Sequence, residues 1–254
     1  MLDITGVGVD SIDVAGAARR IASLAREGAA RLSGDGFRAA YVCTPNAEHM
    51  MDAQKDRHFK RILNEADLVV PDGSGVVLAA RLLGYGRIPR TPGFDLAYAL
   101  VSNQDEYPFS FYFFGGRPGV AEKAAENILR EHPRVRIAGC RDGYFNESDE
   151  PDIIEKINGS GADLLYVALG APKQEKWIYR NRAKIKVPVC MGVGGTIDAL
   201  AGTVRLAPPF FRERGLEWLY RLAREPWRAK RMLKLPQYTL YAIWWRFFGR
   251  RKNG

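Results

Sequence analysis

At residues 164–182 the chain reads LLYVALGAPKQEKWIYRNR, and this stretch indicates the class of fold. The apolar run 164–169 has the length of a buried strand. A Gly-Ala-Pro turn follows it, and a helix-length segment then occupies 174–182. A buried strand, a turn and a helix form the unit of a parallel sheet, because the helix carries the chain back to the edge where the next strand begins.

The same unit recurs along residues 1–202. Further short apolar runs lie at 39–43, 67–70, 109–114, 135–139 and 187–193, and a weaker one lies at 7–12. Helix-length stretches lie at 14–27, 49–65, 75–83, 119–131 and 151–157. The pattern predicts an α/β domain of Rossmann-like type over 1–202, with a parallel sheet and helices on both faces. Residues 203–254 are predicted to form a mainly helical, basic C-terminal appendage.

Turn residues follow five of the predicted strands, at 44–46, 71–73, 115–119, 170–174 and 194–196. Because the carboxyl ends of parallel strands share one edge of the sheet, these loops are expected to converge on one crevice. Glycine lets the backbone approach a ligand, and a helix N-terminus offers N–H groups to phosphate. The loops therefore favour a nucleotide or sugar-phosphate site, although each loop alone is also explained as a simple turn.

The glycines of these loops are candidate binding residues for a nucleotide sugar: Gly115, Gly116, Gly170, Gly194 and Gly195. No loop has the spacing of the dinucleotide fingerprint, and none contains the Gly-Lys-Ser/Thr of a P-loop. The sequence therefore argues against a dehydrogenase and against an NTPase.

Asp72 is the first candidate for chemistry. It follows the apolar residues 68–70 and precedes a predicted helix, so its carboxylate is expected at the edge of the crevice. A nearby helix N-terminus favours the ionised form of a carboxylate, which a general base requires. An Asx-turn or a helix cap is the alternative interpretation.

Other polar side chains are predicted on the same rim. Thr44 and Asn46 offer a hydroxyl and an amide, which suit sugar hydroxyls and acetamides, although Thr-Pro-Asn is also an ordinary turn. Arg90 lies in a loop long enough to reach the crevice, where a guanidinium binds diphosphate through paired hydrogen bonds; a solvated surface charge is the alternative. Lys173 and Gln174 stand at a helix start, where they point at a ligand or merely occupy the first turn.

Metal and nucleophile chemistry have little support in the sequence. His49 and Asp52 are three residues apart on a predicted helix, but two groups do not make a metal site. No Gly-x-Ser-x-Gly elbow occurs. We therefore expect neither a metal nor a cofactor. The cysteines Cys43, Cys140 and Cys190 are odd in number and lie in apolar runs, which indicates buried thiols in a reducing compartment.

The net charge of +9 is concentrated in the last fifth of the chain. Residues 203–254 contain 13 Lys and Arg against 3 Asp and Glu, together with four of the five tryptophans. This asymmetry predicts contact with an anionic surface, either a membrane or a nucleic acid. No apolar run reaches the roughly 18 residues of a membrane span, and the N-terminal residues lack the features of a signal peptide. We expect a cytoplasmic protein.

Two features of the appendage suggest how it is used. Four arginines have a spacing that aligns them along one helical face, although Pro226 is expected to end one helix and begin the next. They are candidates for binding a diphosphate: Arg221, Arg224, Arg228 and Arg231. The aromatic run 238–248 and the basic cluster 250–252 suit a helix that lies at the inner surface of the cell membrane. Packing of this segment on the core, or across an interface of a homo-oligomer, is the alternative.

Nine motifs carry a resemblance to a known family. They lie at 44–46, 71–77, 90–96, 114–122, 143–145, 170–175, 192–198, 207–209 and 217–222. In this order they resemble the WecG/TagA/CpsF glycosyltransferases, family 26, over roughly residues 5–235, and the TagA type most closely. The resemblance implies an inverting, metal-independent transferase. By motif, Asp72 stands in the place of the catalytic base, and Thr44, Asn46, Arg90 and Gln174 stand in the places of active-site polar residues.

The resemblance also implies substrates. Tyr144 and Asp198 fall where the family approaches the nucleotide of a UDP-sugar. In the TagA branch, N-acetylmannosamine passes from UDP to an undecaprenyl-diphosphate-linked N-acetylglucosamine, which gives the β-1,4-linked disaccharide that primes wall teichoic acid. Other branches use UDP-N-acetylmannosaminuronic acid or UDP-glucose. A nucleic-acid-binding protein that uses the basic appendage is the rival of another class, although the near-neutral charge of 1–202 argues against a nucleic-acid partner.

Overall fold

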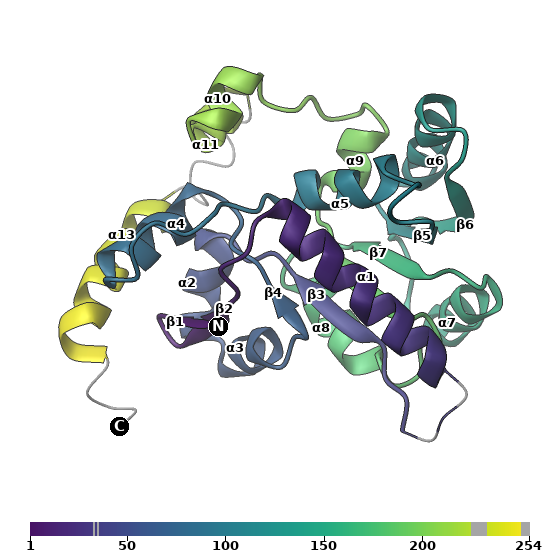
Figure 1. Cartoon of the computed structure of the whole chain (residues 1–254), viewed down its shortest axis with the longest axis horizontal. Coiled ribbons are helices and arrows are strands. Elements are labelled where there is room, and N and C mark those ends of the chain that lie inside the picture. Colours follow the sequence, from purple (N-terminus) through teal and green to yellow (C-terminus); the bar gives the residue numbers. More distant parts are fainter. Residues whose placement is uncertain (33, 35, 225–232, 250–254) are drawn as a thin grey trace.

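A six-stranded parallel sheet organises the chain, in the order β4-β3-β8-β7-β5-β6 (Figure 1). The computed structural model describes residues 1–32, 34, 36–224 and 233–249. The sheet strands are β3 (Ala40–Cys43), β4 (Leu68–Val69), β5 (Ser110–Gly115), β6 (Arg136–Arg141), β7 (Leu164–Ala168) and β8 (Val189–Gly192). All pairings within the sheet are parallel. The six predicted strands and the parallel sheet are thereby confirmed.

The weaker apolar run near the N-terminus forms a separate element. Its strand β2 (Val7–Val9) pairs antiparallel with β1 (Leu2–Ile4) rather than joining the parallel sheet. The backbone then turns to the sheet edge, where Asp10 N–H donates to the carbonyl of Val69 at 2.7 Å. The Asp10 carboxylate accepts in return from Val69 N–H at 3.0 Å.

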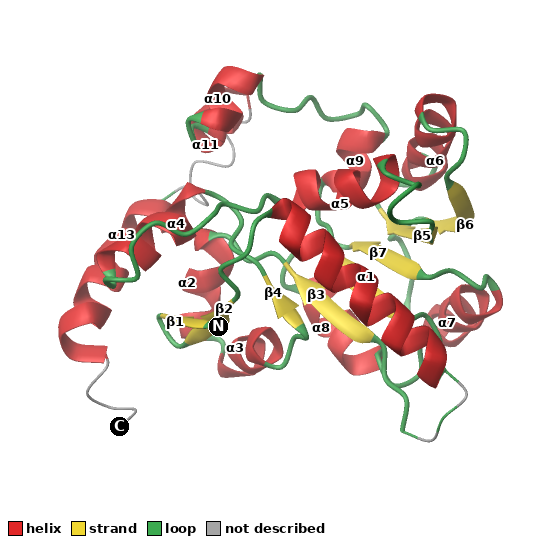
Figure 2. Ribbon diagram, in the orientation of Figure 1, coloured by secondary structure: helices red, strands yellow, loops and turns green. Residues whose placement is uncertain are grey.

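Helices cover both faces of the sheet (Figure 2). The helices α1 (Val14–Arg31), α5 (Gly93–Ser102), α6 (Val120–Glu131) and α9 (Thr196–Leu200) pack on one face. The other face carries α2 (Ala47–Lys55), α3 (Arg57–Asn64), α4 (Ser74–Leu82), α7 (Glu150–Gly159) and α8 (Lys173–Asn181). Alternate strand residues divide between the two cores, as Leu164 and Leu165 do, because successive side chains of a strand point to opposite faces.

Two helical segments differ from their predicted extents. The stretch 49–65 contains two helices, because Asp56 leaves the helical conformation and its carboxylate caps α3 by accepting from Phe59 N–H at 2.9 Å. Helix α5 is not among the predicted helices. It begins after Pro92, an N-terminal signal, and its apolar residues Leu96, Ala97 and Leu100 are fully buried.

The described part of 203–254 is mainly helical, as predicted. It comprises α10 (Pro209–Glu213), α11 (Glu217–Arg224), α13 (Lys234–Trp244) and a π-helical turn η3 (Trp245–Gly249). Helix α13 lies along α2 and α4 (Figure 1) and buries Tyr238 and Ala242 completely in the core on that face. The boundary at residue 202 stays a prediction, and part of the appendage completes the core of 1–202.

Polar contacts with α2 hold α13 in place. The Lys234 ammonium contacts the Asp52 carboxylate of α2 at 2.8 Å. The Tyr241 hydroxyl donates to the side chain of Gln54 at 3.2 Å.

No helix in the described ranges has both the length and the hydrophobicity needed to cross a bilayer.

Candidate active site

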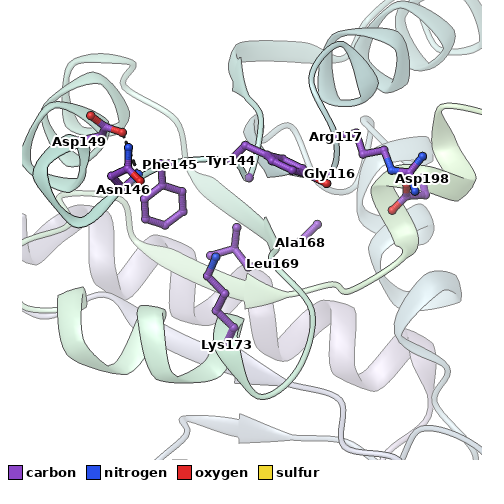
Figure 3. Close-up of a pocket in the computed structure, with 11 residues that line it drawn as sticks. Gly116, Arg117, Tyr144, Phe145, Asn146, Asp149, Ala168, Leu169, Lys173 and Asp198 are labelled. Atoms are coloured by element: carbon purple, nitrogen blue, oxygen red, sulfur yellow. Dashed lines mark hydrogen bonds between the residues drawn. The ribbon is translucent and has the colours of Figure 1, made fainter. Parts of the chain in front are cut away.

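The predicted loops share one edge of the sheet, and a pocket of about 730 Å³ opens there (Figure 3). It lies beyond the carboxyl ends of β5, β6, β7 and β8. Its lining residues are Gly116, Arg117, Gly143, Tyr144, Phe145, Asn146, Asp149, Ala168, Leu169, Lys173 and Asp198. The structure thus brings together four of the predicted nucleotide-binding residues, Gly116, Tyr144, Lys173 and Asp198. Among the described residues, the predicted crevice corresponds to this cavity.

The floor of the pocket depends on backbone without side chains. Gly115 has φ +135°, and a Cβ there would collide with the carbonyl of Ala168. The next N–H, of Gly116, donates to that carbonyl at 3.1 Å, and the Gly116 carbonyl accepts from Gly143 N–H at 2.9 Å. Three loops are therefore joined backbone to backbone. Only glycine at 115 permits this approach.

Opposite charges and aromatic rings line the walls. Tyr144 is 64 % exposed, and its N–H donates to the Asp142 carboxylate at 2.8 Å, which holds the loop after β6. The Lys173 ammonium lies 4.9 Å from the centre of the Phe145 ring, a cation–π contact. Figure 3 shows Asp198 and Arg117 together at the other end of the pocket from Phe145. The site therefore offers ammonium and guanidinium groups for phosphate, and carboxylate and aromatic groups for a nucleoside.

Gly170, Gly194 and Gly195 lie in the loops that follow β7 and β8 and are not among the residues that line the pocket. Gly170 has φ +74° and Gly194 has φ +51°, both in the region that favours glycine. Gln174 is 3 % exposed, and its side-chain oxygen accepts from Gly194 N–H at 3.1 Å. Its amide is therefore turned into the protein between the loops that follow β7 and β8.

A second group of predicted residues follows β3 and β4. The Asn46 side chain caps α2 by accepting from the N–H groups of Glu48 and His49. Asp72 N–H donates to the carbonyl of Pro45 at 3.1 Å, so the two loops are hydrogen-bonded to each other. The Thr44 hydroxyl lies against α5, where a Cβ at Gly93 would be 2.7 Å from the oxygen.

Asp72, Thr44 and Asn46 are all partly exposed at this edge. Asp72 lies just before Gly73, which has φ +82° and precedes the first residue of α4. Its placement at the helix start agrees with the sequence, and the helix N-terminus favours a negative charge there. The pocket lining in Figure 3 does not include these three residues, which lie along the same edge at β3 and β4.

Arg90 contacts the C-terminal segment. Its guanidinium donates to the carbonyl of Arg212 at 2.6 Å, and the Arg212 side chain pairs with Asp95 of α5. Arg212 also lies 5.6 Å from the ring centre of Phe94. The loop that was predicted to reach the crevice therefore also anchors α10.

The arginines predicted for the diphosphate are placed only in part. Arg224 is exposed at the end of α11, and Arg221 lies in the same helix. Arg228 and Arg231 lie outside the described residues. Among the described residues, no group of three or more His, Cys, Asp or Glu side chains is placed to hold a metal ion. Metal independence stays a prediction.

Reasoning from sequence missed several pocket residues. Arg117, Phe145, Asn146 and Asp149 line the cavity without having been selected. Arg117 stands in Gly-Gly-Arg-Pro-Gly, directly before α6, and this position was a usable signal. Asn146 and Asp149 form a capping box at the 3-10 turn η1 (Glu147–Asp149), so their sequence pattern indicates a helix cap rather than a binding site.

Comparisons with known proteins show which family the chain belongs to. A family model described as the glycosyl transferase WecG/TagA/CpsF family matches residues 2–252. A protein from Bacillus spizizenii, named N-acetylglucosaminyldiphosphoundecaprenol N-acetyl-beta-D-mannosaminyltransferase, is 36 % identical over 205 residues, which are 81 % of this chain and 79 % of the relative. A protein of the same name from Bacillus subtilis strain 168 is 35 % identical over 204 residues, which are 80 % of this chain and 79 % of the relative. With a match over nearly its whole length, this chain belongs to the WecG/TagA/CpsF family of glycosyltransferases.

Proposed function

We propose that this enzyme transfers N-acetylmannosamine from UDP to undecaprenyl-diphosphate-linked N-acetylglucosamine and forms a β-1,4 bond. The observation that carries the proposal is the similarity, over four-fifths of the chain, to two relatives named for this mannosaminyl transfer and this acceptor. The open pocket at the carboxyl edge of a parallel sheet supports it, because such edges bind nucleotides in open α/β folds.

The donor is proposed to occupy the pocket. Lys173 and Arg117 supply positive charge for the diphosphate, and Lys173 also stands at the N-terminus of α8, which favours an anion. The exposed ring of Tyr144 offers a stacking surface for the uracil. Asp198 offers a carboxylate that accepts hydrogen bonds from ribose hydroxyls.

The chemistry is a single displacement at the anomeric carbon. The acceptor hydroxyl oxygen forms a bond to this carbon from the face opposite UDP, while the bond to the β-phosphate oxygen breaks and its electron pair leaves with UDP. Asp72 takes the proton of the hydroxyl as general base. Cationic side chains and helix N-termini stabilise the charge on the departing diphosphate. Inversion of configuration follows from the single attack.

The lipid acceptor motivates a proposal for the appendage. Large apolar side chains stand exposed along α13 and η3, among them Leu240 (68 %), Trp244 (49 %), Phe247 (60 %) and Phe248 (60 %). The opposite side of the helix is occupied by its contacts with the core. An exposed aromatic face with neighbouring basic residues suits the headgroup region of an anionic membrane. We place the enzyme peripherally at the inner face of the cell membrane, while a homo-oligomer stays a prediction.

A donor panel tests the reaction. UDP-N-acetylmannosamine, UDP-N-acetylmannosaminuronic acid and UDP-glucose are each offered with a prenyl-diphosphate N-acetylglucosamine acceptor, and mass spectrometry reads the product. We expect N-acetylmannosamine transfer, with the rate unchanged by EDTA. Preferred transfer of another sugar rejects the proposed donor, and loss of the reaction in EDTA rejects the metal-free mechanism.

Vesicle co-sedimentation tests the membrane surface. The wild-type protein is expected to sediment with phosphatidylglycerol vesicles. The double variant Phe247→Ser/Phe248→Ser is expected to stay in the supernatant. Leu129→Ser is the matched control, because Leu129 is also an exposed apolar side chain (41 %) but lies on α6. Equal sedimentation of the three proteins rejects this surface, and retention on DNA rather than vesicles favours the nucleic-acid alternative.

A further inference from the structure

Two adjacent buried polar side chains connect the loops beside the pocket. Gln174 and Glu175 are the second and third residues of α8 and are each 3 % exposed. The side-chain oxygen of Gln174 accepts from Gly194 N–H at 3.1 Å. The side-chain nitrogen of Gln174 donates to the Glu175 carboxylate at 2.8 Å. A continuous chain of hydrogen bonds therefore runs from Glu175 through Gln174 to the backbone of Gly194.

The carboxylate dictates which way the amide faces. An ionised carboxylate accepts hydrogen bonds only, whereas a backbone N–H donates only. The amide of Gln174 satisfies both neighbours in one orientation, with nitrogen toward Glu175 and oxygen toward Gly194. The flipped amide would lose both hydrogen bonds and place its oxygen against a carboxylate. Leaving such buried groups unpaired is costly.

Packing leaves this pair little freedom. A Cβ at Gly192, the last residue of β8, would lie 2.9 Å from the Gln174 nitrogen and 3.3 Å from the Glu175 oxygen. The pair therefore rests directly on the backbone of the strand. Glu175 also lies near β3, where burial first, and this carboxylate second, raise the pKa of the Cys43 thiol. The acid thus lies beneath the strand ends that lead into the candidate active site.

Gln174 joins the loops on two sides of the pocket, one through its backbone and the other through its side chain. The backbone N–H of Gln174 donates to the carbonyl of Gly170 at 2.9 Å, which closes the loop between β7 and α8. Gly194 begins the loop that leads into α9, and Asp198 of α9 lines the pocket. The orientation of the Gln174 side-chain amide therefore affects the wall of the site that the loop after β8 forms.

We propose that Glu175 is a positioning residue that orients the Gln174 amide and thereby holds the Gly194 loop and Asp198 in place for the donor. This inference rests on the proposed function, because its kinetic test measures the KM for the UDP-sugar. Gln174 then acts through the loop rather than by contact with the substrate. Glu175 is buried and does not contact the substrate, yet donor binding depends on it.

Two substitutions of Glu175 separate its acceptor from its charge. Glu175→Gln keeps an oxygen that accepts from Gln174, and we expect a donor KM within about threefold of wild type. Glu175→Leu removes the acceptor, and we expect the donor KM to rise about tenfold or more, with a smaller change in kcat. Equal effects of the two substitutions on KM overturn the proposal.

An exchange of the two residues tests the direction of the chain. Gln174→Glu alone places two carboxylates together, and we expect at least a tenfold loss of kcat/KM. In the double variant Gln174→Glu/Glu175→Gln, the new carboxylate accepts from both Gly194 N–H and the new amide. We expect recovery to within about fivefold of wild type, because the Gly194 N–H and the amide that faces residue 174 again have an acceptor. A double variant as inactive as Gln174→Glu shows that the Gln174 amide itself meets the substrate, and overturns the proposal.

A measurement without substrate separates this inference from the proposed function. Exchange of the Gly194 amide hydrogen is expected to accelerate in Glu175→Leu and to stay slow in Glu175→Gln. The matched control is Asn181→Ala at the end of α8, which removes a fully buried side chain whose amide donates to the backbone carbonyl of Trp177. It should lower Tm without altering Gly194 exchange or donor KM. Failure of the wild-type protein to bind UDP rejects the donor pocket, whereas unchanged Gly194 exchange in Glu175→Leu rejects the positioning role.

Discussion

The guanidinium of Arg90 donates a hydrogen bond to the backbone carbonyl of Arg212 at 2.6 Å and so ties the C-terminal segment to the loop that precedes α5. The Ser74 hydroxyl adds a second tie by donating to the carbonyl of Gly215 at 3.0 Å. Ser74 begins α4, two residues after Asp72. Helix α10 is therefore held beside the residue proposed as the base, although 122 residues separate Arg90 from Arg212.

Arg90→Ala is expected to release α10 from this loop. A hydrogen bond from a charged donor contributes about 1.5–3 kcal/mol to stability, and this substitution removes it. Trypsin cleavage between 205 and 224 should rise about tenfold, since cleavage follows the population of the open segment. Arg87→Ala, an exposed arginine of the same loop, is the control and should behave as wild type. Equal cleavage of both variants would mean that Arg90 does not hold the segment.

Asp72→Asn is expected to stop the chemistry and to spare the donor site. The amide keeps the size of the side chain but cannot take a proton, and a positioned general base contributes typically about 10²–10⁴-fold to the rate. Turnover should fall by that factor, while UDP affinity measured by calorimetry stays within about twofold, because Asp72 is not among the pocket-lining residues. Normal turnover by this variant would exclude Asp72 as the base.

Gly115→Ala is expected to destabilise the fold around the pocket. The new Cβ meets the Ala168 carbonyl on the neighbouring strand, at a backbone angle that disfavours side chains. Overpacking and strain together cost about 3 kcal/mol. Gly119→Ala also has a positive φ, +82°, but open space around the Cβ, and should cost only about 1–2 kcal/mol. Urea denaturation of the two variants measures the difference, and equal losses would contradict the close approach of β5 and β7.

The cysteines are expected to stay unreactive in the folded protein. Burial raises the pKa of Cys190 to about 12 and that of Cys140 also to about 12. Both thiols remain protonated at pH 8, so a disulfide reagent should modify neither until the chain is denatured. The folded-state pKa lies above the unfolded value of roughly 8.5. Ionisation therefore favours the unfolded chain as pH rises above about 9, and Tm should fall there. Rapid modification of the native protein at pH 8 would contradict this burial.

Local sequence patterns predict much of this structure because the information they use is local. The apolar run and turn at 164–174 predict a buried strand followed by a loop at the crevice; β7 is that strand, and Lys173 lines the pocket. Asp72 likewise stands at the start of a helix on the carboxyl edge. The motifs also indicated the family, which the match over residues 2–252 confirms. Asp56, in contrast, splits a predicted helix through one capping contact that the hydrophobic pattern does not reveal.

By itself, the sequence determined the strands, their order along the chain, the loops that carry the polar residues and the basic character of the last fifth. Periodicity and turn chemistry are written in neighbouring residues, so they are legible without a fold. Tertiary structure alone decided that β8 lies between β3 and β7, that Arg90 meets Arg212, and that the amide of Gln174 faces Gly194. These contacts join residues far apart in the chain, and they depend on how whole strands and helices pack against one another.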